Sequence, residues 1–415
     1  MTEFEFAKKI DEAGGKAYLV GGAVRDKFRG VAAHDRDYCV TGLDEKTFNK
    51  IFDSAPKFGK SFPVYSVEIE DAACEVAFAR TEIKVGTGYR GFEILFSPDV
   101  TIEQDLYRRD TTINAMAIEL LSGELVDPFG GREDVLNKKI RPVSEHFTDD
   151  PVRALRAARQ AAQFNFEICA ETVEAMKLCR EELSREPTER IFGELETALK
   201  TNKPSIFFRS LERADLLEVT FPEIFNLRGK TQPTEFHPEG DAYEHTLKIL
   251  DDVAKINPKP IVRFAALVHD IGKGKTPEEM LPHHYLHEKR GLEVLKETNR
   301  RMTLPSDWKK VAAFVIKEHM RAPRLEKSGK IVDLLLSLHK LKISAKDFCD
   351  IINLDNHGLP FYLEHAQEII DELLKIGGKD APPELEGAAI GKWIRSNRIK
   401  LFVKIYSKEL RAYGK

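Results

Sequence analysis

The sequence has 415 residues, of which 32% are charged and 42% hydrophobic, a composition typical of globular proteins with more than one domain. No apolar run approaches the roughly 20 residues that cross a bilayer, so neither a membrane protein nor a membrane partner is expected. The formal net charge of −4 excludes a generally basic nucleic-acid binder, so any contact with nucleic acid must use local patches.

Cysteine usage indicates a reducing compartment. The five cysteines are scattered, odd in number and without a C-x-x-C pair, which argues against a disulfide framework or a zinc finger. The first six residues, MTEFEF, do not contain the apolar core of a signal peptide. We therefore expect a cytoplasmic protein with reduced, buried thiols.

The first informative segment begins at Tyr18. Tyr18 to Val20 are predicted to form a short buried strand, Gly21 and Gly22 a tight turn, and the residues after them a helix. Glycine at such a turn lets backbone N–H groups approach a phosphate, and a helix N-terminus adds partial positive charge. A Gly-Gly turn alone is weak evidence for a phosphate site.

Two aspartates, Asp35 and Asp37, follow this turn. On one strand, residues two apart point their side chains to the same face. Mg²⁺ prefers oxygen ligands and usually also binds substrate phosphates, so this face is a candidate site for two Mg²⁺ ions. An isolated Asp-x-Asp is most often only a solvated surface. Together with the glycine turn, in this order, it suggests a nucleotidyltransferase.

β-type runs continue to about residue 145. Strands are predicted at residues 17–20, 37–41, 74–79, 92–96 and 116–120, and Glu75 lies on the third of them. Between the third and the fourth strand, residues 81–91 are rich in glycine and are predicted to form a mobile loop. Helical periodicity then dominates from Pro151 almost to the C-terminus.

The first long helix carries arginines at steps of three. Pro151 suits its first position and Asp150 its N-cap, and Arg153, Arg156 and Arg159 form one inclined ridge. The small apolar residues between them predict close packing, so the guanidiniums should meet carboxylates or phosphate. The alternatives are an Asp150 that serves only as a cap and arginines in surface ion pairs.

Histidine usage changes after a predicted linker at residues 228–240. Nine of the twelve histidines lie between His237 and His357, which indicates a distinct module. Residues 377–383, rich in glycine and proline, interrupt the last helical region. A basic amphipathic helix is predicted at residues 392–411. Either it contacts RNA phosphates or its charges are solvated above packed aromatic side chains.

The motifs stand in the order found in bacterial CCA-adding tRNA nucleotidyltransferases: YLVGGAVRD, DRD, ARTE, RRDTTINA and DDPVRALRAAR. The chain resembles the class II type that carries a C-terminal HD module. The resemblance implies addition of C, C and A to tRNA 3′ ends from CTP and ATP, without a nucleic-acid template and with Mg²⁺. The tRNA 3′-hydroxyl would attack the α-phosphorus and expel pyrophosphate.

The resemblance also implies a role for each matching position. Asp35 and Asp37 would be catalytic and hold Mg²⁺, with Glu75 as a candidate third carboxylate. Asp150 would accept from the exocyclic amine of C or A and Arg153 would donate to the ring nitrogen, a polarity that G and U do not offer. The nucleotide-binding residues implied are Gly22, Arg25, Arg109, Asp150, Arg153, Arg156 and Arg159. The loop at residues 81–91 would serve the change from C to A and argues against an enzyme that adds only C.

The histidine-rich region resembles the HD hydrolase superfamily. Imidazole and carboxylate together suit a divalent transition metal better than Mg²⁺. The ligands implied are His245, His269, Asp270 and Asp355, with His284 and His319 next, whereas His283 and His287 have no clear place. Related modules imply a phosphatase or 2′,3′-cyclic phosphodiesterase. The alternative is a degenerate module that serves only as a tRNA-binding scaffold.

The fold class expected is α+β. A polymerase-beta-type nucleotidyltransferase head, with a mixed sheet and helices, would be followed by an all-helical neck and body and an all-helical HD domain. The boundaries predicted are 1–145 for the head, 146–228 for the neck and body, 229–360 for the HD domain and 361–415 for the basic tail. The rivals are an A-adding specialist, a bacterial poly(A) polymerase and an RNA-binding HD phosphohydrolase. Either a monomer or a homodimer is compatible with the sequence.

Overall fold

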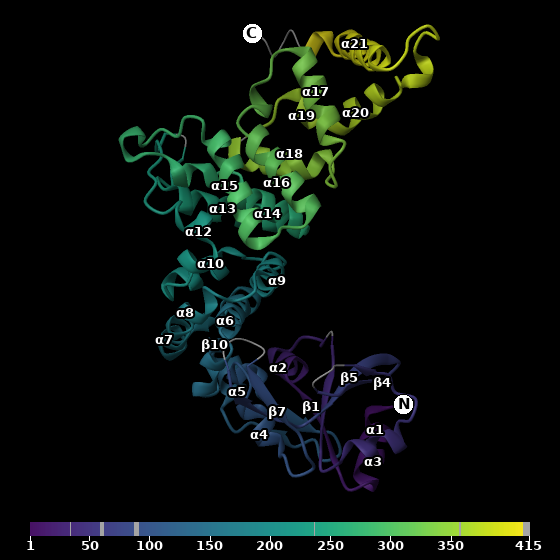
Figure 1. The fold of residues 1–415 in the computed structure, drawn as a ribbon, viewed down its shortest axis with the longest axis vertical. Coiled ribbons are helices and arrows are strands. Elements are labelled where there is room, and N and C mark those ends of the chain that lie inside the picture. The colour runs from purple at the N-terminus through teal and green to yellow at the C-terminus, as the bar shows by residue number, and fades with distance from the viewer. Residues whose placement is uncertain (34, 59–61, 87–90, 236, 357, 410–415) are drawn as a thin grey trace. The chain divides into compact units, whose positions relative to one another are not determined.

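The computed structural model describes residues 1–33, 35–58, 62–86, 91–235, 237–356 and 358–409 (Figure 1). The chain forms two compact units, and each is described by itself. Unit 1 comprises Met1–Glu194 and Ile206–Thr220, and unit 2 comprises Leu195–Ser205 and Phe221–Lys415. Within the described ranges, no helix is both long enough and apolar enough to cross a membrane.

Unit 1 is built on a mixed seven-stranded sheet with the order β3-β4-β5-β2-β1-β8-β9 in the described residues. Its strands are β1 Lys16–Val20, β2 Asp37–Thr41, β3 Lys57–Phe58, β4 Val64–Ile69, β5 Ala72–Phe78, β8 Ala117–Glu119 and β9 Leu125–Val126. β2 and β5 run parallel, and the other neighbours are antiparallel. Two small sheets accompany it, an antiparallel pair of β6 Thr81–Lys84 with β7 Phe92–Leu95 and a parallel pair of β10 Lys139–Ile140 with β11 Glu167–Ile168.

The helices have the following bounds. Up to residue 220 they are α1 Glu3–Glu12, α2 Gly22–Arg29, α3 Glu45–Ile51, α4 Ile102–Tyr107, α5 Gly131–Leu136, α6 Val152–Phe164, α7 Ala170–Leu178, α8 Arg180–Leu183, α9 Thr188–Ala198, α10 Ser205–Arg213 and α11 Leu217–Thr220. After residue 220 they are α12 Pro222–Phe225, α13 Ala242–Ile256, α14 Pro260–Val268, α15 His287–Met302, α16 Ser306–Glu318, α17 Ser328–Leu338, α18 Ala345–Asn356, α19 Phe361–Glu364, α20 Ala366–Leu374 and α21 Ala388–Ile405. Short 3₁₀ helices are η1 Thr112–Asn114, η2 Glu145–Asp149, η3 Ile271–Lys275, η4 Glu278–Met280, η5 Ala322–Arg324 and η6 Gly378–Asp380.

The alternation of side chains along the central strands separates two cores. Tyr38 and Val40 of β2 belong to the core that also contains Phe6 of α1 and Phe48 of α3. Cys39, between them, belongs to a second core with residues of α4. Because the side-chain period of a strand is two, Asp37 points to the same face of the sheet as Cys39. The buried pattern of β2 thus decides on which face of the sheet its first carboxylate lies.

The five strands predicted from the sequence all form, and the α+β class with a helical second part is confirmed. β4 was not predicted, although Tyr65, Val67 and Ile69 alternate with more polar residues and are buried. The predicted mobile loop is partly wrong, because its first four residues form β6, which pairs with β7. Residues 87–90 of that loop lie outside the described residues.

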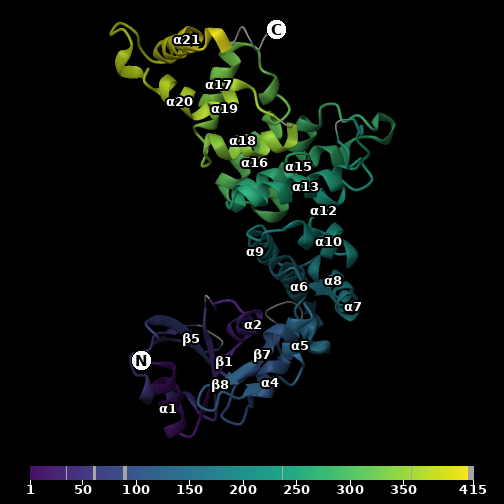
Figure 2. The same ribbon diagram turned by 180° about the vertical axis from the view of Figure 1, so that it is seen from behind.

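Unit 2 is made of helices without a strand among its described residues (Figure 2). Its core takes fully buried side chains from α13, α14 and α16 to α18, and from α20, such as Val253, Val315 and Phe348. The predicted tail helix forms as α21. Its Phe402 is fully buried in this core, and Arg395 makes an ion pair with Asp333 of α17 at 2.8 Å. These contacts favour the packed alternative over a helix whose basic face is entirely available to RNA.

The described residues of the segment predicted as a linker, residues 228–240, are packed and do not form an open spacer. A β-bridge joins Thr231 to Asp241, and the amide of Gln232 donates to the carbonyl of Gly240 at 3.0 Å. The side chain of Gln232 is buried and accepts from Lys273 of η3. Glycine and proline here form a closed, packed loop of unit 2, and composition alone does not distinguish such a loop from a spacer.

Candidate active site and metal cluster

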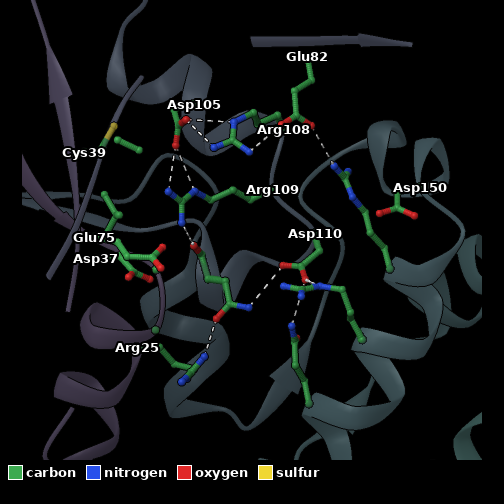
Figure 3. A pocket seen from close by; sticks show the side chains of 18 of the residues that line it. Arg25, Asp37, Cys39, Glu75, Glu82, Asp105, Arg108, Arg109, Asp110 and Asp150 are labelled. Atoms are coloured by element: carbon green, nitrogen blue, oxygen red, sulfur yellow. Dashed lines mark hydrogen bonds and ion pairs between the residues drawn. The ribbon is translucent and has the colours of Figure 1, made fainter. Parts of the chain in front are cut away.

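Unit 1 contains a cavity of about 870 Å³ that brings the head motifs together (Figure 3). Most of the predicted nucleotide and metal residues line it: Gly22, Arg25, Asp37, Glu75, Arg109, Asp150, Arg153, Arg156 and Arg159. Asp35 is not one of the described residues that line it. The glycine turn after β1 and the arginine helix α6 therefore line one common cavity.

The glycine turn makes room for an arginine. Gly21 has a φ of +67°, in the left-handed region that favours glycine, and α2 begins at Gly22. A Cβ on Gly21 would stand 3.0 Å from Nη1 of Arg109. The turn therefore lets the guanidinium of Arg109 lie against the backbone at the end of β1.

Asp37 is the first residue of β2 and lies opposite Val20, the last residue of β1. Its strand neighbour on β5 is Glu75, so two carboxylates from parallel strands stand side by side at the wall of the cavity (Figure 3). Desolvation by the surrounding walls and the charge of Glu75 raise the pKa of Asp37. Two adjacent carboxylates disfavour each other's ionisation, and a divalent cation relieves this repulsion. The donor set fits Mg²⁺.

Asp35 is placed differently from the prediction. It precedes β2 and is exposed, so it does not share a strand with Asp37. On the β1 side the pairing starts only at Asp37, because β1 ends at Val20 opposite it. Asp35 is near enough for its charge to raise the pKa of Asp37.

Arg109 is held by a buried carboxylate that the sequence prediction missed. Asp105 is 1% exposed and accepts from Arg109 Nη2 at 3.0 Å and from Arg108 Nη2 at 2.7 Å. Burial alone would raise the pKa of Asp105, but the two guanidiniums hold it below its ordinary value. Asp105 lies on α4, and Arg109 follows four residues later, just after the helix ends. This i,i+4 spacing was the signal in the sequence that could have identified Asp105.

Arg156 and Arg159 of α6 meet carboxylates, as predicted, whereas Arg153 hydrogen-bonds a backbone carbonyl, which was not predicted. Arg156 Nε donates to Asp110 at 2.8 Å, Arg159 Nε to Glu194 at 2.6 Å, and Arg153 Nη1 to the carbonyl of His146 at 2.7 Å. Burial disfavours the charge of Asp110, but Arg156 and the backbone N–H of Thr111 lower its pKa. The cavity is thus lined with guanidiniums that are already oriented.

Asp150 has two functions in this structure. Its Oδ1 accepts from the N–H of Val152 at 3.1 Å, so it caps the start of α6, which begins at Val152 rather than at Pro151. Both of its oxygens also accept from Arg190 of α9, at 3.0 and 2.7 Å. Arg190 was not predicted, and no local spacing in the sequence connects it with Asp150.

Arg25 also lines the cavity and is held by hydrogen bonds and by an aromatic ring. Its Nη1 donates to the side-chain oxygen of Asn114 at 2.6 Å, and Asp26 accepts from its Nε at 3.0 Å. The guanidinium lies over the ring of Phe164, 4.2 Å from the ring centre, and Arg29 lies over the same ring at 4.5 Å. Phe164 is the last residue of α6, so this ring joins α2 to the arginine helix.

In unit 2, Asp270 stands at the centre of a buried cluster. Its Oδ2 lies 3.2 Å from His269 Nε2 and 3.9 Å from His245 Nε2. Asp355 Oδ1 lies 3.1 Å from His245 Nε2 and 3.6 Å from His269 Nε2. The four ligands implied by the resemblance therefore lie together: His245 on α13, Asp355 on α18, and His269 and Asp270 between α14 and η3. Lys273 adds an ammonium group 2.5 Å from the same Oδ2.

The second oxygen of Asp270 faces two further histidines. Its Oδ1 lies 3.2 Å from His287 Nε2 and 3.3 Å from His319 Nε2. His287, which had no clear place in the prediction, thus belongs to the cluster. His284, which was preferred, does not lie in it: its ring bonds to Thr276 at 2.8 Å and to the carbonyl of Thr231 at 3.0 Å.

The start of α15 explains why His287 belongs to the cluster and the histidines before it do not. His287 is the first residue of the helix and is buried, whereas His283 precedes it in an exposed segment. His357 lies outside the described residues.

The cluster fits a cation of the transition series. His269 Nε2 and Asp270 Oδ1 are buried and have no hydrogen-bond partner among the described residues. Burial alone would lower the pKa of His269, but Asp270 and Asp355 raise this pKa to about 10. Positive charge is therefore favoured at this point. Two groups around Asp270 have ligand geometry, one with His245 and His269 and one with His287 and His319.

Three family models match the chain. They are described as the poly A polymerase head domain, at residues 17–141, the probable RNA and SrmB-binding site of polymerase A, at residues 165–227, and the HD domain, at residues 242–355. The first contains the glycine turn and both strand carboxylates. The third contains the six side chains grouped around Asp270.

Curated relatives cover most of the chain. A multifunctional CCA protein of Nitrosococcus oceani is 43% identical over 77% of this chain and 79% of its own length. One of Haemophilus influenzae is 42% identical over 73% of this chain and 74% of its own length. One of Acinetobacter baumannii is 37% identical over 93% of this chain and 96% of its own length.

Solved structures share the fold. The Bacillus stearothermophilus CCA-adding enzyme in complex with CTP has a TM-score of 0.67 at 21% identity, covering 98% of this chain and 92% of that one. A CCA-adding enzyme in complex with ATP has a TM-score of 0.64 at 22% identity, covering 96% and 89%. At this level of identity the likeness concerns the fold.

Proposed function

Because the chain belongs to the family of multifunctional CCA proteins, we propose that it adds C, C and A to the 3′ end of tRNA, using CTP and ATP. The single observation that supports this best is the cavity of unit 1, in which the paired carboxylates of Asp37 and Glu75 share one space with the arginine helix α6. A nucleoside triphosphate needs both features, carboxylates for its metal ions and guanidiniums for its phosphates.

In this proposal Asp37 and Asp35 hold Mg²⁺, and Glu75 is the neighbouring third carboxylate. When bound there, Mg²⁺ lowers the pKa of the attacking 3′-hydroxyl and stabilises the charge on the leaving oxygens. Arg109 is oriented by Asp105 and lies against the glycine turn, so its remaining donors face the cavity and bind phosphate. Gly22, at the start of α2, brings backbone N–H groups to the nucleotide.

The arginine helix supplies the rest of the nucleotide site. Arg156 and Arg159 bind the triphosphate and the ribose. Asp150 and Arg153 contact the base edge, where C and A offer an amine donor beside a ring acceptor. Asp150 is bound by Arg190 in this structure, so an incoming base competes with a guanidinium for that carboxylate. U and G present a carbonyl oxygen where C and A present the amine, so they leave this exchange uncompensated, which favours C and A over U and G.

Incubation with tRNA substrates tests the proposal and its rivals. The substrates are tRNA without its terminal CCA and tRNA that ends in CC, each with one labelled nucleotide at a time. Incorporation of CTP on the first and ATP on the second supports CCA addition. ATP incorporation only on tRNA that ends in CC indicates an A-adding specialist, and ATP incorporation into any RNA indicates a poly(A) polymerase.

We also propose a second activity for unit 2, supported by the buried cluster around Asp270. It is a metal-dependent phosphohydrolase acting as a phosphatase and 2′,3′-cyclic phosphodiesterase on damaged RNA ends. His245, His269, Asp270 and Asp355 hold a divalent transition metal, with His287 and His319 on the other side of Asp270. Phosphate release that depends on added Mn²⁺ or Co²⁺ and is lost after chelation supports this activity. Persistent lack of release indicates a scaffold.

The remaining proposals concern the whole protein. We propose four functional parts, with boundaries at 1–145, 146–228, 229–360 and 361–415, a monomer or a homodimer as the working form, tRNA as the partner and the cytoplasm as its location. Buried free cysteines are compatible with a reducing compartment. Analytical ultracentrifugation with and without tRNA tests the oligomeric state and the partner.

A further inference from the structure

Three of the four cluster histidines are fixed by backbone carbonyl groups. In each of them Nδ1 bonds to a carbonyl oxygen, and Nε2 faces Asp270. The bonded pairs are His269 with Ala266, His287 with His284 and His319 with Ile316, at 2.7, 2.9 and 3.0 Å. A carbonyl oxygen only accepts, so the proton of the neutral ring sits on Nδ1 and Nε2 keeps its lone pair for a metal.

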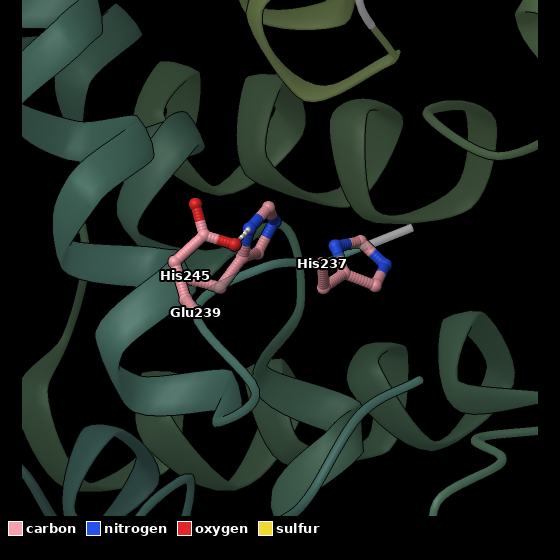
Figure 4. A group of neighbouring side chains, drawn as sticks. All are labelled: His237, Glu239 and His245. Carbon is pink, nitrogen blue, oxygen red and sulfur yellow. Dashed lines mark ion pairs between the residues drawn. The ribbon is translucent and has the colours of Figure 1, made fainter. Parts of the chain in front are cut away.

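His245 is the exception. Its Nδ1 is buried and has no hydrogen-bond partner among the described residues. The carboxylate oxygen Oε2 of Glu239 lies 3.7 Å away and is also buried and without a hydrogen bond in the described part of the chain. Figure 4 shows the carboxylate of Glu239 facing the ring of His245. A buried donor and a buried acceptor without partners destabilise the fold unless they form a hydrogen bond with each other.

Glu239 is carried by the loop that composition predicted as a linker. The loop is closed by the bridge between Thr231 and Asp241. Beside Glu239, the ring of His237 packs against the ring of His245, with centroids 4.6 Å apart at 70°. The other oxygen of Glu239, Oε1, lies 3.3 Å from the ammonium of Lys248 on α13. The carboxylate is therefore presented to His245 by an anchored segment, and it stays charged beside a lysine.

We propose that Glu239 is a positioning residue of the metal cluster in unit 2. It accepts the Nδ1 proton of His245, so that Nε2 is the nitrogen that binds the metal. A movement of about 1 Å turns the present separation into a charge-assisted hydrogen bond. The carboxylate also makes the imidazole a more basic ligand, which a backbone carbonyl does less strongly. This inference rests on the proposed metal-dependent function of unit 2.

The test measures Co²⁺ binding by the visible absorbance of the ion. It uses the full chain in the Asp35→Ala/Asp37→Ala background, so that the site in unit 1 does not contribute. Glu239→Leu is expected to weaken Co²⁺ binding by about 10–100-fold. Glu239→Gln should recover part of this loss, because its amide oxygen still accepts from Nδ1 but carries no charge. Glu368→Leu, at an exposed carboxylate on α20, is the matched control and should change the affinity by less than about twofold.

Each other outcome has a defined meaning. Unchanged Co²⁺ binding in Glu239→Leu overturns the inference, and so does an equal loss in Glu368→Leu, because the loss would then not be specific to Glu239. His245→Ala calibrates the assay: if it binds Co²⁺ normally, the proposed metal centre itself fails. Both tryptophans, Trp308 and Trp393, lie in unit 2, so their fluorescence during urea unfolding verifies that each variant is folded.

Discussion

The two candidate sites of this chain use the same residue types in opposite ways. In the cavity of unit 1, carboxylates and guanidiniums are paired with each other around a large space, as Arg156 is with Asp110. In the cluster of unit 2, buried imidazoles converge on one carboxylate, Asp270, with little space between them. The first arrangement suits a large anion that enters and leaves, and the second suits a small cation that stays.

The two sites also differ in how buried charge is stabilised before a ligand binds. The guanidiniums of unit 1 have carboxylate partners before any ligand arrives, so a triphosphate exchanges one set of ion pairs for another. In unit 2, Asp270 Oδ1 and His269 Nε2 keep unsatisfied capacity, which a cation fills. The sites should therefore respond independently to substitution, and the predictions that follow, from the largest expected effect to the smallest, test this.

Asp37→Ala should reduce nucleotide addition by roughly a thousandfold, since metal-assisted stabilisation is worth several kcal/mol. Asp35→Ala should abolish addition as well. Phosphate release by unit 2 should stay within about twofold in both. The measurement is labelled CTP incorporation into tRNA without CCA, alongside phosphate release, with the exposed Asp53→Ala as control. Loss of both activities in a folded Asp37→Ala protein would mean that the sites are not separate.

Asp270→Asn is the reciprocal variant. It removes the charge that both groups of histidines share, so metal-dependent phosphate release should fall by roughly a hundredfold or more, as expected when a carboxylate ligand is lost. CTP and ATP incorporation should not change. Asp371→Asn, at an exposed carboxylate on α20, is the matched control. Intact phosphate release in Asp270→Asn would show that the cluster is not the hydrolytic site.

Asp110→Asn should destabilise unit 1 alone. It leaves Arg156, whose side chain is 41% exposed, without its buried partner; solvent offsets part of the loss, so the expected cost is about 1–3 kcal/mol. The folded-state pKa of Asp110 is held below its ordinary value, so its contribution is fully present above about pH 4 and is lost as the pH falls further. The variant should therefore show a weaker acid dependence between pH 4 and 3 than the wild-type chain.

Hydrogen exchange of β1, β2 and β5 measures this loss, and tryptophan fluorescence reports unit 2 separately because both tryptophans lie there. Equal protection of the three strands in wild-type and variant protein would contradict the assigned role of Asp110.

Asp150→Ala should alter selection more than rate. Removal of the acceptor for the base amine should reduce the preference for CTP and ATP over UTP and GTP by about 10–100-fold. Competition assays with pairs of nucleotides on the same tRNA measure this ratio. Asp149→Ala, next to it and paired with His146, is the control. An equal fall in incorporation of all four nucleotides would indicate that Asp150 acts only as the cap of α6.

Phe164→Leu should have the smallest effect. It removes the ring beneath Arg25 and keeps an apolar side chain, so CTP binding should weaken by about two- to fivefold. Equilibrium binding of CTP measures this change. Phe28→Leu removes a comparable ring, 5.4 Å from Arg132, outside the residues that line the cavity, and should leave CTP binding unaltered.

The sequence was sufficient for those parts of the head that depend on local patterns. The strand before Gly21, the helix after Gly22 and the ridge of arginines on α6 all follow from turn chemistry and helical spacing. It was not sufficient for partners that only the tertiary fold brings close. Arg190 reaches Asp150 from a different helix, and Asp110 meets Arg156 across a similar distance in the chain.

In unit 2 the helical periodicity predicted the all-helical class and the tail helix, but not the orientation of every histidine. His284 and His287 are three residues apart, and only the start of α15 decides which of them is buried. The loop before α13 shows the same limit, because its glycines and prolines suit a spacer as well as a closed loop. Its packing depends on Gln232 reaching Lys273, a contact between side chains far apart in sequence.

The parallel pairing of β2 with β5 has a consequence for how the protein matures. Asp37 and Glu75 are neighbours only in the finished sheet, because α3, β3 and β4 separate them along the chain. Such a contact must await closure of a long loop and is among the late events of folding. On the ribosome, the head therefore cannot assemble its carboxylate pair until β5 has been synthesised and has docked.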